Sequence, residues 1–452
     1  MSFDQVDLES LAAPIKNAIV GGPFGSNLVG KDYTPSGIPV IRGQNMGERW
    51  VSGDFVFVSE EKGIALTPNK ARPGDLVFTQ RGTLGQVAVV PSGKFSEYIV
   101  SQSQMKITLD PSKADVNFLY YVFRSPEQLE YIKNTSIQTG VPHTNLGILR
   151  KTPIQLPPLK IQREIGLMLG ALDDRITLLR ETNATLEAIA QALFKSWFVD
   201  FDPVRAKLEG RAPEGMDEAT ARLFPDSFEE SELGLVPRGW RSTSVSEVTE
   251  IVKGKSYSSK DLVTEHETAL VTLKSFARGG GFRLDGFKPY SGAYKASQVV
   301  VSGDLIVAYT DVTQAAELIG KPAIVIGVDE HKTLVASLDV GIVRPLAEKV
   351  SRQFLYGLFN TDAFQAHTLS HTSGTTVLHL SKNGVGSYKF VCPPIPAVES
   401  FSVVAESLTR RQQVNIDQMR NLATLRDTLL PRLISGQLRL PQAQAAAEEA
   451  LA

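Results

Sequence analysis

The chain has 452 residues, too many for one hydrophobic core, and its 42% hydrophobic and 21% charged residues are ordinary for a globular protein. No stretch approaches about 18 consecutive apolar residues, and the opening "MSFDQVDLES" lacks the basic and apolar regions of a signal peptide, which argues against membrane spans and secretion. The single cysteine, Cys392, excludes an internal disulfide, so we expect a cytoplasmic protein.

The net charge of −2 is unevenly distributed along the chain. Residues 1–158 carry 15 basic and 14 acidic side chains, and residues 237–394 carry 17 and 14. Residues 200–236 carry only 4 basic against 10 acidic side chains. We therefore interpret 201–236 as an acidic linker between two mildly basic blocks, a balance that permits nucleic-acid binding without demanding it.

The first block, 1–158, has short Val/Ile/Leu runs separated by glycine and proline, a pattern that predicts β-strands and turns. Residues 117–134 read as short helices, so the block is a mixed α/β domain. "GGPFGS" (21–26) is rich in glycine but lacks the strand–GxGxxG–helix pattern, and a tight turn is the better interpretation.

A long helix is predicted over 159–200, directly after Pro157 and Pro158. Its apolar residues recur in steps of four and three, which is typical of a coiled-coil seam. Asn183 is the clear polar break in the seam and can fix its register. Asp173 and Asp174 are interpreted as solvated charges.

The second block, 237–394, precedes a second long helix at 395–437 and a tail at 438–452 that we expect to be disordered. Pro431 is expected to kink or end the second helix.

The two halves of the chain repeat at one constant offset. "LEAIAQALFKSWF" (186–198) matches the apolar pattern of "LATLRDTLLPRLI" (422–434), and the proline pairs at 157–158 and 393–394 match at the same offset without a gap. Two unrelated domains of similar composition do not easily produce this match. We therefore predict an α+β fold of two tandem mixed α/β domains, separated by two long helices that form an antiparallel coiled coil with an internal pseudo-two-fold repeat.

No catalytic or metal site is predicted. "KGKSY" (253–257) lacks the first glycine of a Walker loop, and no Asp-Pro-Pro-Tyr or Asn-Pro-Pro-Tyr stretch of an adenine methyltransferase occurs. His367, His371 and His379, with Cys392 beyond them, could in principle ligate zinc, but their spacing matches no compact finger.

Polar clusters between the predicted strands are the candidate DNA-binding residues, because Arg, Lys, Gln, Asn, Ser and Thr on loops read base edges and phosphates. In the first block these are Arg42, Gln44, Asn45, Gln80, Arg81, Thr83, Gln138, Thr139, His143 and Thr144. In the second they are Lys274, Ser275, Arg278, Tyr309, Thr310, Thr313, His371, Ser373 and Thr375. "SQSQ" (101–104) is a weaker fourth cluster of the first block, and ordinary polar turns are the alternative for each.

Several stretches, in order, resemble the specificity subunit of a Type I restriction–modification system. They are "GGPFGSNLVGKDYTPSGIPVIRGQNM" (21–46), "RPGDLVFTQRGTLGQVAVVP" (72–91), "LPPLKIQREI" (156–165), "ALFKSWFVDFDPV" (192–204), "SELGLVPRGW" (231–240) and "LRDTLLPRLISGQL" (425–438). The resemblance covers essentially the whole chain and is weakest around 272–284.

The resemblance implies a non-catalytic DNA-binding subunit. Each of its two target-recognition domains would read half of a bipartite, asymmetric site in double-stranded DNA, and two methyltransferase subunits would dock on its long helices. Restriction subunits would complete the assembly, which directs adenine methylation and restriction. S-adenosylmethionine, ATP and Mg²⁺ would be held by partner subunits, and no cofactor by this chain.

Two other functions are weighed against this one. A coiled-coil scaffold could bind protein partners through its two blocks, and salt-sensitive DNA binding would separate that alternative, since phosphate contacts release counterions. A self-contained DNA-modifying enzyme is made improbable by the missing motifs.

Overall fold

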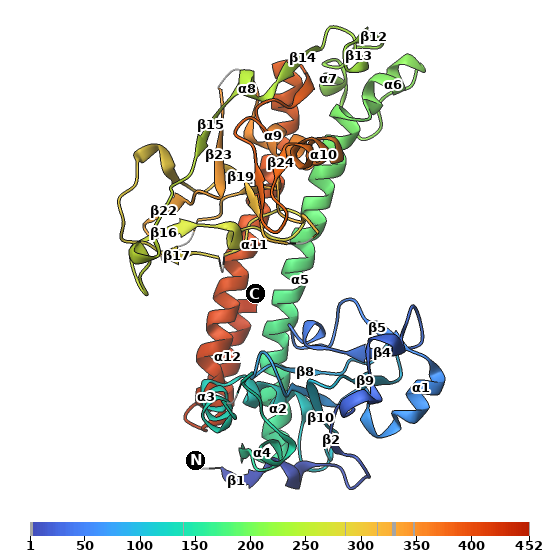
Figure 1. Ribbon diagram of the computed structural model, residues 1–452, viewed down its shortest axis with the longest axis vertical. Coiled ribbons are helices and arrows are strands. Elements are labelled where there is room, and N and C mark those ends of the chain that lie inside the picture. Colours follow the sequence, from blue (N-terminus) through green and yellow to red (C-terminus); the bar gives the residue numbers. More distant parts are fainter. Residues whose placement is uncertain are drawn as a thin grey trace. The chain divides into compact units, whose positions relative to one another are not determined.

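The computed structural model describes residues 3–138, 140–284, 286–313, 315–327, 331–346 and 349–451 (Figure 1). The chain forms two compact units, and each contains one part of both long helices. Unit 1 comprises Met1–Arg180 and Ile416–Ala452, and unit 2 comprises Glu181–Asn415. In the described ranges, no helix combines the length and the hydropathy that a membrane span requires.

Unit 1 is built on two small sheets and a strand pair. The antiparallel sheet has the order β2 (Ile19–Gly21), β10 (Gln104–Ile107), β7 (Leu76–Thr79) and β8 (Val87–Val89). The mixed sheet has the order β3 (Tyr33–Thr34), β5 (Val56–Val58), β4 (Ile38–Ile41), β9 (Tyr98–Val100) and β6 (Lys70–Ala71), with β4 and β9 parallel. β1 (Asp4–Asp7) pairs with β11 (Pro153–Leu156) just before the long helix begins.

The described part of unit 1 contains five short α-helices and one part of each long helix. The short helices are α1 (Glu60–Ala65), α2 (Val116–Arg124), α3 (Pro126–Thr135), α4 (Leu146–Arg150) and α12 (Leu440–Leu451), and the long helices are α5 (Leu159–Phe198) and α11 (Ile395–Ile434). α2 begins at Asp115, whose carboxylate accepts the amide N–H of Phe118, and six consecutive residues of α2 from Phe118 are buried. The core joins Phe78 of the sheet and Phe118 of α2 to Leu169 of α5 and Leu429 of α11.

Unit 2 repeats this plan. Its antiparallel sheet has the order β15 (Thr249–Lys253), β23 (Val340–Pro345), β19 (Leu305–Ala308) and β21 (Pro322–Ile324). Its mixed sheet has the order β17 (Lys288–Pro289), β16 (Thr268–Val271), β22 (Thr333–Ala336) and β18 (Val299–Val300), with β16 and β22 parallel. β14 (Arg241–Ser244) pairs with β26 (Lys389–Cys392) before α11, and β20 (Thr310–Asp311), β25 (Leu378–Leu380) and β24 (Thr372–Ser373) form a further small sheet.

The remaining helices of unit 2 are α6 (Asp202–Leu208), α7 (Glu218–Ala221), α8 (Val245–Val248), α9 (Arg352–Phe359) and α10 (Asp362–Ser370). Aromatic rings dominate its core. Phe194 and Phe198 of α5 contact Phe354 of α9 and Phe401 of α11, with ring centroids 5.1 to 5.6 Å apart. Such edge-on contacts add to the burial of large apolar surfaces.

The two long helices pack against each other within each unit, which confirms the predicted helix pair. Each is 40 residues long, and their bounds are related by the same offset as the two proline pairs. In unit 2 the helices are antiparallel, because Asn183 of α5 contacts Asn415 of α11 whereas Phe198 contacts Phe401. In unit 1, Leu179 of α5 packs in the same core cluster as Met419 and Leu422 of α11.

Asn183 belongs to a polar layer in the helix pair of unit 2. Its Nδ2 donates to the carbonyl of Gln412, and the Nε2 of Gln412 donates to the carbonyl of Asn183. Asn415 is fully buried and donates to the Oδ1 of Asn183 at 2.7 Å. These bonds form only when the three residues face each other, as expected of a register device, and the buried Oδ1 of Asn415 has no partner in the described structure.

The interpretation of 201–236 as an acidic linker was wrong. The segment contains α6, α7 and the hairpin of β12 (Phe228–Ser231) and β13 (Gly234–Pro237). Val204 and Phe224 are buried against Trp197 and Trp240. The acidic residues lie on the surface of a folded segment whose few apolar residues complete the core of unit 2.

The expectations that the second helix ends at Pro431 and that the tail is disordered were also wrong. α11 continues through Pro431 to Ile434, and the burial of the flanking Leu430 and Leu433 offsets the hydrogen bond that the proline removes. The tail forms α12, in which Ala443 and Ala447, one turn apart, are buried in the core of unit 1. Alanine has the highest intrinsic helix propensity, so burying this narrow stripe suffices to order the tail.

Candidate nucleic-acid interface

Two of the predicted clusters of unit 1 meet where β7 ends. The amide of Gln80 donates to the carbonyl of Ser103 at 2.7 Å, and the carbonyl of Gln80 accepts the amide of Thr144 at 2.9 Å. Arg81 and Ile137 both form backbone bridges with His143. We name this meeting of three chain segments junction 1: residues 80–83, Ser103 and 137–144.

The side chains of junction 1 differ in accessibility. Arg81, Thr83 and Gln138 are exposed, and Gln138 donates to the hydroxyl of Ser136. Thr144 is buried. The half-buried His143 holds its ring with Nδ1 3.2 Å from the carbonyl oxygen of Val141. Arg81 and Thr83 are therefore the side chains of junction 1 that are most accessible to a ligand. The predicted Thr139 lies outside the described residues.

The third predicted cluster lies on the short helix η4 (Gly43–Asn45), which follows β4. The carboxamide of Asn45 is 1% exposed; it accepts the amide N–H of Arg42 and donates to the carbonyls of Ser52 and Asp54. Since these bonds occupy its polar atoms inside the fold, the prediction that Asn45 contacts DNA was wrong, and it holds the loop instead.

The neighbours of Asn45 remain available. Gln44 is exposed and donates to the carbonyl of Asp54, and the half-buried Arg42 has an Nε without a partner in the described structure. A Cβ atom on Gly43 would lie 3.8 Å from the side-chain amides of both Gln86 and Gln104. The η4 loop is therefore next to the antiparallel sheet of junction 1, beside the fourth cluster, 101–104.

Unit 2 builds the same arrangement, junction 2, from different side chains. The amide of Tyr309 donates to the carbonyl of Asp339, and its carbonyl accepts the amide of Leu380, both at 2.8 Å. Thr310 and Ser373 both pair with His379. Asp339, Ser373, His379 and Leu380 are related to their counterparts in junction 1 by the offset that relates α5 to α11. Junction 2 comprises residues 309–313, Asp339 and 371–380.

Most predicted residues of junction 2 lie near each other, but several serve the fold. Ser373 and Thr375 are exposed, whereas Thr310 is buried. The hydroxyl of Thr313 accepts the amide of Glu317, and the buried carboxylate of Asp311 accepts three backbone amides. The loop after β19 is thus held from inside, with Ser373 and Thr375 outside.

The remaining candidates of unit 2 surround η7 (Leu273–Ser275), the counterpart of η4. Lys274 is exposed, and the exposed Arg278 pairs with Glu317 at 3.4 Å. Ser275 is fully buried and accepts the amide of Thr272, as Asn45 does from Arg42. The prediction that Ser275 contacts DNA was wrong for the same reason.

The histidines divide between two places. The rings of His367 and His371 lie 4.2 Å apart, and burial together with the His371 charge lowers the pKa of His367. His379 is exposed on β25, and burial raises the pKa of the Cys392 thiol. Among the described residues, no three His, Cys, Asp or Glu side chains are arranged to hold a metal ion.

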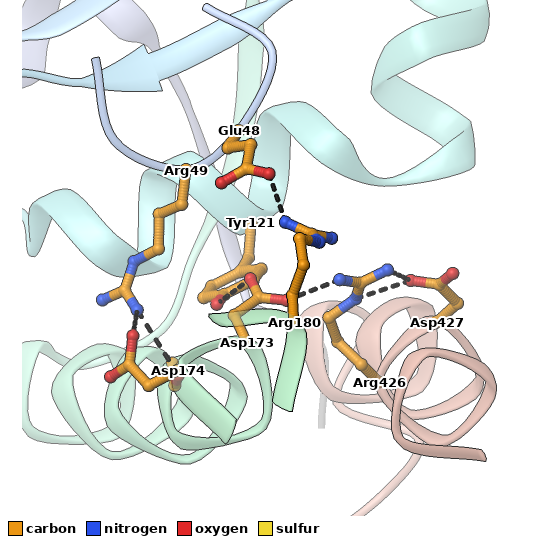
Figure 2. A network of polar contacts seen from close by, with 9 residues as sticks. Glu48, Arg49, Tyr121, Asp173, Asp174, Arg180, Arg426 and Asp427 are labelled. Carbon is orange, nitrogen blue, oxygen red and sulfur yellow. Dashed lines mark hydrogen bonds and ion pairs between the residues drawn. The ribbon is translucent and has the colours of Figure 1, made fainter. Parts of the chain in front are cut away.

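A polar network connects the loop after η4 to the long helices of unit 1 (Figure 2). Arg49 donates to Asp174 at 3.2 Å, to the carbonyl of Gly170 and to Asn117 at 2.8 Å. The exposed Glu48 pairs with Arg180. The loop that carries Gln44 is therefore attached to α5 and α2 at its other end.

Asp173 connects the three helices of this network. Its carboxylate accepts the Tyr121 hydroxyl of α2 at 2.6 Å and pairs with Arg426 of α11 at 2.5 Å (Figure 2). Asp173 is 13% exposed, so its interpretation as a solvated charge was wrong. Burial and the Asp173 charge raise the pKa of Tyr121, which keeps its hydroxyl a donor. Sequence reasoning missed this set because its members come from segments that are far apart in the chain.

Comparisons with known proteins show what this chain is similar to. A family model described as "Type I restriction modification DNA specificity domain" matches residues 35–188, from the approach to β4 into α5. The HindI specificity subunit, a Type I restriction enzyme component of Haemophilus influenzae, is 24% identical, with 84% of this chain and 90% of that protein covered.

The chain is similar to the specificity subunits of Type I restriction enzymes. The MjaIX specificity subunit of Methanocaldococcus jannaschii is 23% identical, with 94% of this chain and 92% of that protein covered. The crystal structure of the S subunit of a Type I system from M. genitalium is 16% identical, covers 96% of both chains and has a TM-score of 0.49. The family model and the two specificity subunits confirm the resemblance inferred from the motifs.

Proposed function

We propose that this chain is the DNA-recognition subunit of a Type I restriction–modification assembly. Each unit reads half of a bipartite, asymmetric site in double-stranded DNA. The observation that carries this proposal is the junction built twice on one backbone plan, which presents Arg81 and Thr83 in unit 1 and Ser373 and Thr375 in unit 2. The same frame with different side chains suits a protein that reads two different half-sites.

The chain itself performs no chemistry in this proposal. S-adenosylmethionine, ATP and Mg²⁺ belong to methyltransferase and restriction subunits. Adenine methylation then depends on this chain only for the choice of site.

Two methyltransferase subunits dock on the long helices, and a repeated surface feature supports this. In unit 1, Leu167 and Leu178 of α5 are 70% and 51% exposed. In unit 2, Val403 and Val414 of α11, which occupy the corresponding positions of the repeat, are 71% and 50% exposed. Exposed apolar side chains at equivalent positions of a duplicated helix suit two copies of one partner.

Single-molecule sequencing of modified bases tests the proposal, with DNA from cells that express this chain and its companion methyltransferase. We expect a split, asymmetric methylated motif that disappears when this chain is deleted. Unchanged methylation by an active companion would contradict the proposal. It would favour the scaffold alternative, in which the units bind protein partners and salt-sensitive DNA binding is not required.

A further inference from the structure

A cleft of about 540 Å³ lies beside junction 2, and the donors that line it point to an anion. Its wall includes Thr249 and Lys253 of β15, Tyr309 of the junction, and Lys382 and Asn383 after β25. Both lysines are exposed, and neither forms an ion pair with a described residue. Among the described residues that line the cleft there is no carboxylate.

Tyr309 forms part of the wall of this cleft. Its ring lies against the backbone of Gly341, where a Cβ atom would meet ring carbon Cε2 at 2.2 Å. Its hydroxyl is inaccessible to water and has no hydrogen-bond partner in the described structure. A ligand in the open cleft therefore meets the two exposed lysines and not this hydroxyl.

The duplication provides an internal comparison. In unit 2, Lys253 pairs with Gly341 across the sheet, and in unit 1 Gly21 pairs with Met105 at the equivalent place. Lys382 corresponds to Leu146, two residues after the matched amides of Leu380 and Thr144. Met105 is fully buried, and a Cβ atom on Gly21 would contact Leu146 at 3.8 Å. Unit 1 thus has Gly21, Met105 and Leu146, with the Oε1 of Gln80 3.7 Å from the Cβ position of Gly21, where unit 2 has two lysines and an open cleft.

We infer that this cleft is a phosphate site that binds the DNA backbone at the half-site read by unit 2, held by Lys253 and Lys382. The inference rests on the proposed function, because it takes double-stranded DNA as the source of the phosphate. The two lysines supply charge without sequence information. In unit 1 the corresponding described positions hold Gly21 and Leu146, so the two half-sites are held by different means.

The test measures DNA affinity against salt concentration for the complex of the full chain with its methyltransferase. The duplexes carry the methylated motif or single base changes in either half-site. Each phosphate contact contributes about 0.9 to the slope of log affinity against log salt. The double variant Lys253→Gln/Lys382→Gln should lower the slope by about 1 to 2 and weaken binding to all duplexes equally.

The matched control is Lys260→Gln/Lys295→Gln, which removes the same charge from two exposed lysines of unit 2 outside the cleft. An equal slope change in the control, an unchanged slope in the cleft variant, or a loss confined to certain base changes would overturn the phosphate site. Binding of inorganic phosphate that the cleft variant loses, with an unchanged DNA slope, would instead assign the cleft to a free phosphate compound. A wild-type complex without salt-dependent DNA binding would contradict the proposed function itself.

Discussion

At the scale of single residues, exposure at the two junctions separates reading side chains from supporting ones. Arg81 and Thr83 are exposed on a backbone fixed by three chain segments, whereas Asn45 and Ser275 are buried and bonded to their own loops. A rigid backbone with free polar tips is what direct readout of base edges requires.

Arg81→Ala tests this reading role. If Arg81 forms a bidentate contact with a base, its loss should cost about 1–3 kcal/mol of binding free energy and relax one position of one half-site. Binding to a library of single-base variants measures this, with Lys94→Ala as a control from another surface of unit 1. Equal weakening on every sequence would make Arg81 a phosphate contact.

Asp311→Asn tests whether the buried carboxylate of Asp311 stabilises the loop of junction 2. Burial raises the pKa of Asp311, but hydrogen bonds from Thr313 and from the amides of Leu318 and Ile319 outweigh it, so the pKa lies below its ordinary value. A depressed pKa stabilises the fold above the unfolded pKa of about 3.9, and this stability is lost as pH falls through the folded pKa. We expect the variant to lose about 1.5–3 kcal/mol at pH 7, because bonds to a charged acceptor are replaced.

Urea unfolding of unit 2 measures this change, followed by the fluorescence of Trp197 and Trp240, which lie in its core. The difference between Asp311→Asn and the wild type should shrink as the pH falls below about 4. A difference of the same size at pH 7 and pH 3 would contradict the role assigned to the carboxylate.

At the scale of elements, the ion pair of Asp173 and Arg426 fastens α5 to α11 and, through Tyr121, to α2. Both charges are mostly buried, so removing one leaves the other buried without a partner charge. Arg426→Ala should therefore cost about 3–5 kcal/mol of the unfolding free energy of unit 1, and Arg426→Met with Asp173→Leu should recover much of it.

The exposed ion pair of Arg180 and Glu48 serves as the control for the variants of the buried ion pair. Its loss in Arg180→Ala should cost less than about 1 kcal/mol, because solvent screens exposed charges. Chemical denaturation of the three variants, followed by the fluorescence of Trp50, gives the comparison. Equal losses for Arg180→Ala and Arg426→Ala would show that burial of the network does not matter.

The long helices could be predicted from sequence because their apolar periodicity extends over 40 residues and recurs at one offset. α6 and α12 could not, because only a few apolar residues, such as Val204 and Ala443, anchor them in cores assembled by distant segments. The candidate clusters were placed correctly between strands, but sequence does not show which side chain points inward. Asn45 and Ser275 were therefore predicted to contact DNA. Gln86, which lies next to the η4 loop, and Arg49, which attaches that loop to α5 and α2, were not predicted.

At the scale of the whole molecule, the duplication predicts how partners bind. Leu167→Asp and Val403→Asp each place a charge on one exposed apolar pair, and each should remove one methyltransferase subunit from the purified complex. The two together should remove both, as native mass spectrometry can count. The exposed Thr177, about 80° around the helix from Leu167, provides the control Thr177→Asp. Retention of both subunits by the double variant would exclude these positions from the interface.

The polar layer has a consequence for chains that carry only half of this protein. Asn183 meets Asn415, whereas at the equivalent place in the other half Leu179 packs with Met419. Two copies of the first half would set Asn183 against Leu179, and two copies of the second would set Asn415 against Met419, each burying an amide without a partner. Only one half of each kind brings the two asparagines together. Separately expressed halves should therefore select each other over themselves, so that shuffling halves between related genes preserves correct pairing only where this asymmetry is inherited.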